Sequence, residues 1–191
     1  MHIEDGVLYI DEYAVELEKS DKDVNIYVYF VEEGYRDDDN TTHEVHQDHD
    51  PYSGGKEGFT FLGSLVNPAD PELRLISRKK ELVAHLLTKT DLLASKLKEG
   101  YSELEERSWE VQESEARALL AVKTPTIDAL CAVRGCSRDY LAAKIVENAD
   151  AARSAGIGIL SWQQETEEKI KTMTLEEFSV MWEAIEDKSL S

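Results

Sequence analysis

The sequence predicts an α+β protein, in which a small N-terminal antiparallel β unit is followed by a long helix or helical hairpin and a C-terminal bundle of short helices. Three observations predict this fold. β-Branched and aromatic residues are concentrated in residues 1–69, apolar residues recur at helical spacing in residues 70–120, and helix-capping signals recur in residues 121–191. A chain of 191 residues, 41% of them hydrophobic, is long enough to bury a substantial core.

Three strands are expected in residues 1–69. The segment GVLYIDEY is short and apolar, and GFTFLGSLV is flanked by glycines. The segment DVNIYVYFVEEG is apolar on both faces, with Ile26, Val28 and Phe30 on one and Tyr27, Tyr29 and Val31 on the other. A strand of this kind is expected to be central in its sheet or to lie at an interface.

The same domain carries most of the negative charge. The chain has a formal net charge of −19, and residues 1–70 hold 18 acidic and 4 basic side chains, a net of −14. Residues 71–191 hold 22 acidic and 17 basic side chains, a net of −5. This asymmetry indicates two functional regions, of which the first is an acidic β domain.

A long polar loop rich in His and Asp is predicted over residues 36–58, because the segment has no periodicity. Within it, His43, His46 and His49 recur every three residues beside aspartates. Imidazole and carboxylate ligands suit Zn, Ni or Fe, so the three histidines are candidate ligands for a transition metal. Residues three apart point in different directions on a strand or helix, so only an irregular loop or several subunits could bring them together. A solvated acidic loop without metal is the simpler interpretation.

Amphipathic helices are predicted over residues 70–120. Asp70 and Pro71 are a good N-cap and first helical residue, and Gly100 is a good helix end. Ser102 and Glu105 then form a capping box. The apolar positions of the first helix are Ile76, Val83, Leu86, Thr90, Leu93 and Leu97. The pair forms either an antiparallel hairpin or one helix that is broken at Gly100.

Four short helices are predicted in residues 121–191. They begin after the Thr124–Pro125 pair, after Ser137, at about Leu160 and at the capping box of Thr174 and Glu177. The second of them is expected to end at Gly156. Trp109, Trp162 and Trp182 all fall in helical segments, where we expect them to pack in the core.

Residues 126–145 have the spacing of a DNA-reading helix-turn-helix, with Cys131 at the small position, Gly135 at the turn and Leu141 in the second helix. Three basic and three acidic residues balance each other over residues 126–147, whereas phosphate binding needs an excess of Lys and Arg. The spacing therefore predicts tight helix packing, and nucleic acid is not an expected partner. Cys131 and Cys136 are expected to be reduced thiols, because their spacing suits neither a redox motif nor a zinc site.

Motifs for catalysis and for membrane insertion are absent. The sequence contains no GxGxxG, GxxxxGK[ST], GxSxG or HExxH, so no enzymatic activity and no resident cofactor are expected. No apolar run approaches the roughly 20 residues that a membrane helix needs, and the first residues lack the basic and apolar regions of a secretory signal. A membrane is therefore not an expected partner.

Three blocks between about residues 105 and 170 carry a family resemblance: ERSWEVQESEARALLA, TPTIDALCAVRG and LAAKIVENADAARSAGIGILSWQQETEEKI. Together they resemble a small helical module at the C-terminal end of tail-fibre, tail-fibre-assembly and other tail-associated proteins of tailed bacteriophages and prophages. The matching positions are Trp109, Gln112, Glu115, Ala116, Thr124, Pro125, Ile127, Asp128, Ala129, Leu130, Arg134, Gly135, Leu141, Lys144, Ile145, Asn148, Ala149 and Gln163.

The resemblance implies a structural or assembly role in a phage tail, with no catalytic residues. It predicts a protein that is made in the cytoplasm of the host bacterium, resides in the tail of the virion and binds other tail proteins or a second copy of itself. The candidate partner-binding residues are those of the strand that is apolar on both faces, Ile26, Tyr27, Val28, Tyr29 and Phe30. Two alternatives stay open, an acidic inhibitor that mimics DNA and blocks a DNA-binding enzyme of the host, and a metal-binding virion protein.

Overall fold

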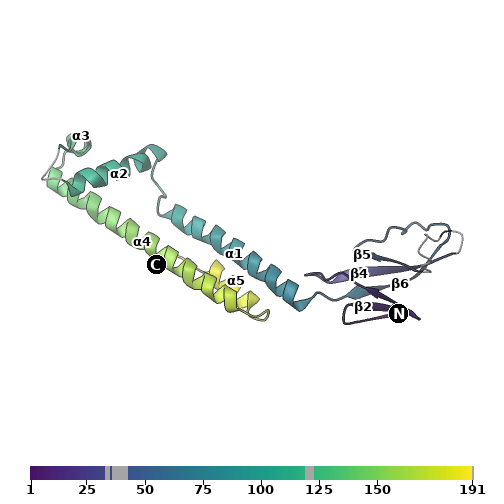
Figure 1. The fold of residues 1–191 in the computed structure, drawn as a ribbon. Coiled ribbons are helices and arrows are strands. Elements are labelled where there is room, and N and C mark those ends of the chain that lie inside the picture. Colours follow the sequence, from purple (N-terminus) through teal and green to yellow (C-terminus); the bar gives the residue numbers. More distant parts are fainter. Residues whose placement is uncertain (33–34, 36–42, 119–122, 191) are drawn as a thin grey trace. The chain divides into compact units, whose positions relative to one another are not determined.

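The chain folds as the predicted α+β protein, with β-strands in its first part and helices in the rest (Figure 1). The computed structural model describes residues 1–32, 35, 43–118 and 123–190. Two compact units are present, Met1–Lys80 and Glu81–Ser191. The second unit contains the predicted 121–191 region and all of the predicted 70–120 region except the first turns of its first helix.

The first sheet is a meander of three short antiparallel strands, β1 (His2–Glu4), β2 (Val7–Ile10) and β3 (Tyr13–Glu16). Strands β1 and β2 are joined by a two-residue turn of Asp5 and Gly6, whose φ angles are 49° and 78°. Positive φ at both positions is the geometry of a type I′ turn, which matches the twist of a two-stranded ribbon. The apolar stretch GVLYIDEY therefore forms β2, its turn and the first residue of β3.

The second sheet has the order β5-β4-β6 and is antiparallel throughout. Its strands are β4 (Val24–Val31), β5 (His43–Gln47) and β6 (Phe59–Asn67). The expected central position of the doubly apolar strand β4 is confirmed. Strand β5 lies inside the segment that we predicted to be an irregular loop over residues 36–58. That prediction was wrong for His43–Gln47, because pairing with β4 supplies hydrogen bonds that the sequence pattern does not reveal.

The core of the first unit lies between the two sheets. Leu8 and Ile10 of β2 pack against Ile26 and Val28 of β4, and each of these side chains is at most 1% exposed. The remaining buried members of this cluster are Leu17 and Val24.

The first two helices are α1 (Pro71–Lys96) and α2 (Glu103–Arg117), and both predicted N-caps are confirmed. Oδ1 of Asp70 accepts a hydrogen bond from the backbone nitrogen of Glu72 at 2.9 Å, and Oγ of Ser102 accepts one from that of Glu105 at 3.2 Å. Helix α2 packs on α3 and α4 and not back along α1. The side chains of α1 that are buried are Leu82, Leu86, Thr90 and Leu93, whereas Ile76 of the predicted seam is 50% exposed.

The last three helices are α3 (Pro125–Arg134), α4 (Arg138–Thr172) and α5 (Phe178–Glu186). The predicted break between Gly156 and Leu160 was wrong, because α4 is a single helix of 35 residues. Glycine in a helix interior costs only about 1 kcal/mol, and the core clusters at the two ends of α4 offset that cost. One end of α4 contributes Leu141 to a core cluster, and the other end contributes Ile170 to a second cluster.

The second unit thus has two separate apolar clusters. The first joins the second half of α1 to the end of α4 and to α5, and its buried members are Leu82, Leu86, Ile170, Met173 and Ile185. The second joins α2, α3 and the beginning of α4, and its buried members are Ala116, Ile127, Cys131, Leu141 and Ala142. Of the three tryptophans expected in the core, Trp109 and Trp162 are half-buried. Trp182 is 38% exposed and stacks on the ring of His85 at 4.0 Å.

Candidate functional site

The three candidate metal ligands do not converge. His43 and His46 lie three residues apart on β5 and therefore point to opposite faces of the sheet. The ring of His43 contacts that of Tyr13 at 5.1 Å, whereas Nε2 of His46 lies 2.7 Å from Oε1 of Glu44. Only the rings of His46 and His49 are neighbours, at 5.9 Å. Within the part of the chain that the structure describes, no three His, Cys, Asp or Glu side chains could hold one metal ion.

A cluster of polar and aromatic side chains connects the turn at residues 50–56 to the second sheet. The hydroxyl of Tyr29 donates to Asp50, and the hydroxyl of Tyr52 donates to Oε1 of Glu44 at 2.9 Å. Lys56 donates from Nζ to Oη of Tyr52 at 3.1 Å. Burial and the hydrogen bond to Asp50 raise the pKa of Tyr29 to about 12. Because these groups satisfy one another, the cluster stabilises the turn.

Sequence reasoning missed this cluster because its members come from three separate segments. The residues DPYSGG indicate a turn, and an aspartate two residues before a backbone N–H is a usual feature of such turns. The backbone nitrogen of Tyr52 indeed donates to Oδ1 of Asp50 at 3.0 Å. The contacts of Tyr52 with Glu44 depend on the pairing of β5, which the sequence pattern did not predict.

The candidate partner-binding strand, Ile26–Phe30, is enclosed on both edges. Strand β4 pairs with β5 on one side and with β6 on the other, so it cannot extend an intermolecular sheet. Ile26 and Val28 are 0% exposed and Tyr29 is 3% exposed. Strand addition at these residues is therefore excluded, because β4 is a central strand. Side-chain contacts of the half-buried Tyr27 and of Phe30, which is 36% exposed, with a partner stay a prediction.

Helices α2 and α3 are joined by a carboxylate that the sequence pattern did not identify as a cap. Glu115 of α2 accepts hydrogen bonds from the backbone nitrogens of Thr126 at 3.2 Å and of Ile127 at 3.0 Å. These are two of the free N–H groups in the first turn of α3. The expected cap residue, Thr124, makes no side-chain cap hydrogen bond and instead accepts one from Arg138. Glu115 thus ties α2 to α3 across a gap of eleven residues, and no local sequence signal reports such a cap.

Several other positions of the family resemblance also hold this unit together. Ile127 is fully buried between the three helices, beside Ala116 and Leu141. Gly135 ends α3 with a φ of 65°, the left-handed conformation that favours glycine at this place. The helix-turn-helix spacing is explained by this packing, as predicted. Oδ1 of Asp128 lies 2.9 Å from Nε of Arg138, so the charges at the turn pair with each other.

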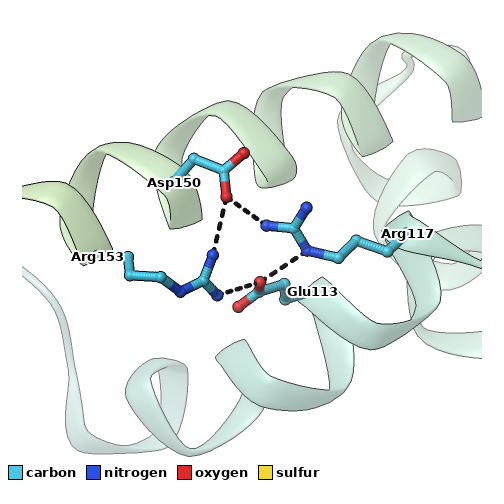
Figure 2. A network of polar contacts seen from close by, with 4 residues as sticks. All are labelled: Glu113, Arg117, Asp150 and Arg153. Carbon is cyan, nitrogen blue, oxygen red and sulfur yellow. Dashed lines mark hydrogen bonds and ion pairs between the residues drawn. The ribbon is translucent and has the colours of Figure 1, made fainter.

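A ring of alternating charges joins α2 to α4 (Figure 2). Oε1 of Glu113 accepts hydrogen bonds from Nε of Arg117 at 2.8 Å and from Nη2 of Arg153 at 2.6 Å. Both guanidinium groups also bind Asp150 of α4, and the Arg153 bond is 2.9 Å long. Hydrogen bonds from Arg153 and Arg117 hold the pKa of Glu113 below its usual value. A four-residue network of this kind orients two helices better than an isolated surface pair would.

The two cysteines are free thiols at the α3–α4 turn, in agreement with the prediction. Cys131 is buried, Cys136 is half-buried, and their Sγ atoms are 4.0 Å apart. Burial and the neighbouring thiol raise the pKa of Cys131. A thiol with a raised pKa is a poor nucleophile, so the position of Cys131 suits packing in the α2–α3–α4 cluster.

Replacing Glu115 with glutamine is expected to destabilise the second unit by about 1–2 kcal/mol, because one of the two accepting oxygens becomes an NH2 donor that faces a backbone N–H group. Burial raises the pKa of Glu115, but the hydrogen bonds from Ile127 and Thr126 outweigh it, and the pKa lies below the usual value of 4.5. The carboxylate therefore stabilises the fold above pH 4.5, and this contribution is lost as the pH falls through the lowered pKa. Urea unfolding from pH 7 to pH 3 should show wild type and variant converge at low pH. Glu110→Gln, an exposed change on the same helix, should leave stability unchanged, and equal losses in both variants would contradict the cap.

Compared with known proteins, the chain matches no family model, no curated protein and no solved structure. In the described residues, every helix is too short or too polar to cross a membrane.

Proposed function

We propose that this chain is a non-enzymatic, tail-associated protein of a tailed bacteriophage, which acts through protein–protein contacts either in the tail or during its assembly. The observation that carries the proposal is the resemblance over three blocks that follow one another in the same order. Matching residues from all three blocks also pack together where α2, α3 and α4 meet. Glu115 comes from the first block, Ile127 and Gly135 from the second, and Leu141 from the third. Because the matching residues form the core of this part of the chain, they support the proposal that it has the same fold as the phage-tail module.

The surroundings of the polar residues also favour a binding role over catalysis. The tyrosine cluster on the second sheet and the charge ring between α2 and α4 consist of groups that are paired with each other. Exposed apolar side chains are instead numerous on the second unit, and among them are Leu104, Val111, Val133, Tyr140, Ile157, Leu160 and Val180. Apolar patches on a protein surface are common sites of contact with other proteins, so these residues are candidate contacts.

The test is to delete the gene from the phage or prophage that encodes it and to analyse purified particles by mass spectrometry and negative-stain electron microscopy. We expect defective tails in the deletion, and rescue by the wild-type chain. A copy number that is a fixed multiple of three or six in wild-type particles would identify a built-in component, whereas absence from the particles would identify an assembly factor. Normal, fully infectious particles from the deletion would contradict the proposal.

A second candidate is an acidic inhibitor of a basic, DNA-binding enzyme of the host, which is favoured by the net charge of −14 on residues 1–70. Such an inhibitor would bind through many weakly directed charge contacts. Its binding should therefore fall steeply between low and moderate salt, because exposed charges are screened beyond about 10 Å at 0.1 M salt. If the chain binds the enzyme equally well at low and at moderate salt, this second function is excluded.

A further inference from the structure

The edge strand β6 differs from the other edges of the two sheets in having no charged residue. Its sequence is FTFLGSLVN, whereas β1, β3 and β5 each contain at least one glutamate. Phe61, Leu62 and Val66 of β6 are 51%, 42% and 58% exposed. Proteins ordinarily protect exposed edge strands with charges or proline, because an apolar edge invites another strand to pair with it. From Gly63 to Asn67, beyond the register shift in the β4–β6 pair, β6 contains neither a charge nor a proline, and such an edge in a chain with 32% charged residues favours cover by a partner.

The hydrogen-bonding pattern shows which backbone groups of β6 face outward. The backbone nitrogen of Asp48 donates to the carbonyl of Asn25 at 2.9 Å, so odd-numbered residues at the start of β4 bond toward β5. Even-numbered residues from Val24 to Val28 then bond toward β6, where their partners are Gly63, Leu65 and Asn67. The N–H and C=O groups of Ser64 and Val66 therefore point away from β4.

Strand β1 offers outward backbone groups on the other side. The two-residue turn makes Glu4 and Val7 a hydrogen-bonded pair, and His2 and Tyr9 are the next such pair. Ile3 lies between them, so its N–H and C=O groups point away from β2. Within the described residues, β1 and β6 belong to separate sheets and are not paired with each other.

A groove of about 680 Å³ lies between these two edges. Its apolar wall includes Ile3, Leu17, Leu65 and Val66, and its rim includes Asp5, Glu18 and the ion pair of Lys19 with Asp70, whose atoms are 2.8 Å apart. The carboxylates therefore outnumber the cations on the rim. The whole N-terminal region has a net charge of −14, which opposes the docking of a second copy and favours a basic partner.

We propose that the groove between β1 and β6 binds an extended segment of a partner protein in which apolar residues alternate with Lys or Arg. The segment adds a strand to the free edge of β6, where its backbone bonds to Ser64 and Val66. Alternate side chains then enter the apolar groove, and the basic ones reach the rim carboxylates. This inference rests on the proposed function in protein–protein contacts, and it specifies the kind of partner segment.

The probe is a labelled peptide of about eight alternating Lys and Val residues, with a Glu–Val peptide as reference, and its binding to the full chain is measured by fluorescence anisotropy. We expect the Lys–Val peptide to bind at least about tenfold more tightly than the reference. Val66→Pro removes the outward N–H group without removing a bond to β4, and proline is tolerated at such an edge position. The variant is expected to weaken binding of the Lys–Val peptide at least about tenfold, whereas Val66→Thr retains it.

Circular dichroism of both variants checks that the fold is unchanged. No binding of the Lys–Val peptide would overturn the proposal, and so would binding that Val66→Pro does not weaken, because charge alone would then account for it. A dimer in sedimentation that Val66→Pro dissociates would also overturn it, since a second copy would occupy the edge. Each of these results is independent of the particle analysis, so failure of the groove and failure of the tail function are distinguishable.

Discussion

Replacing Ile127 with alanine is expected to lower the free energy of unfolding of the second unit by about 2–5 kcal/mol. The side chain is 0% exposed and packs between α2, α3 and α4, beside Ala116, Cys131 and Leu141. Removal of its outer carbons leaves a cavity where three helices meet. Because these helices are held by the rest of the cluster and by Glu115, the cavity is expected to collapse only partly.

Tryptophan fluorescence during urea unfolding measures this effect selectively, because Trp109, Trp162 and Trp182 all belong to the second unit. Val133→Ala is the matched control, since Val133 is on the same helix and is 87% exposed. The control should stay within about 0.5 kcal/mol of wild type. A loss in Ile127→Ala no larger than that of the control would show that the α2–α3–α4 cluster is not the core of the unit.

Replacing Ile26 with alanine is expected to destabilise the first unit by a comparable amount, about 2–5 kcal/mol. Ile26 is 0% exposed on the central strand β4 and packs against the first sheet through Leu8 and Ile10. Two sheets of three short strands have few other contacts to hold them together, so loss of volume at their shared core weakens both. The same change tests the role of β4 as a core strand.

Hydrogen exchange of the strand amides measures the stability of the first unit, and tryptophan fluorescence reports the second unit in the same sample. We expect faster exchange across β2 and β4 in Ile26→Ala, with an unchanged fluorescence transition. Asn25→Ala is the control, because Asn25 is exposed on the same strand. Exchange in Ile26→Ala that matches the control would contradict a core that joins the two sheets.

Several elements could be predicted from short-range patterns. The caps at Asp70, Ser102 and Ser137 are local, since each side chain bonds to a backbone nitrogen two or three residues later. Strand β4 was predicted to be central or to lie at an interface, because apolar, aromatic and β-branched residues occupy all of its positions except Asn25. The spacing around Gly135 predicted a packed turn, because only a residue that adopts positive φ ends α3 in this way.

The candidate sites could not be predicted in the same way. His43 and His46 resemble a ligand pair in sequence, but the pleat of β5 separates them. The residues of the β1–β6 groove come from three separate segments of the first unit, and the exposed edge of β6 follows from which strand pairs with β4. The residue pattern of one strand does not show which of its two edges will remain unpaired in the folded sheet.

Composition and local pattern were enough for the α+β class, the acidic N-terminal region and most helix starts, because propensity, capping and net charge are properties of neighbouring residues. Three features required the packed chain: the continuity of α4 through Gly156, the cap that Glu115 provides to α3, and the enclosure of Ile26–Phe30 within the second sheet. In each of them a contact between distant segments outweighs a local preference of about 1 kcal/mol or less. The free energy of such contacts depends on burial and pairing in three dimensions, which residues close in sequence do not encode.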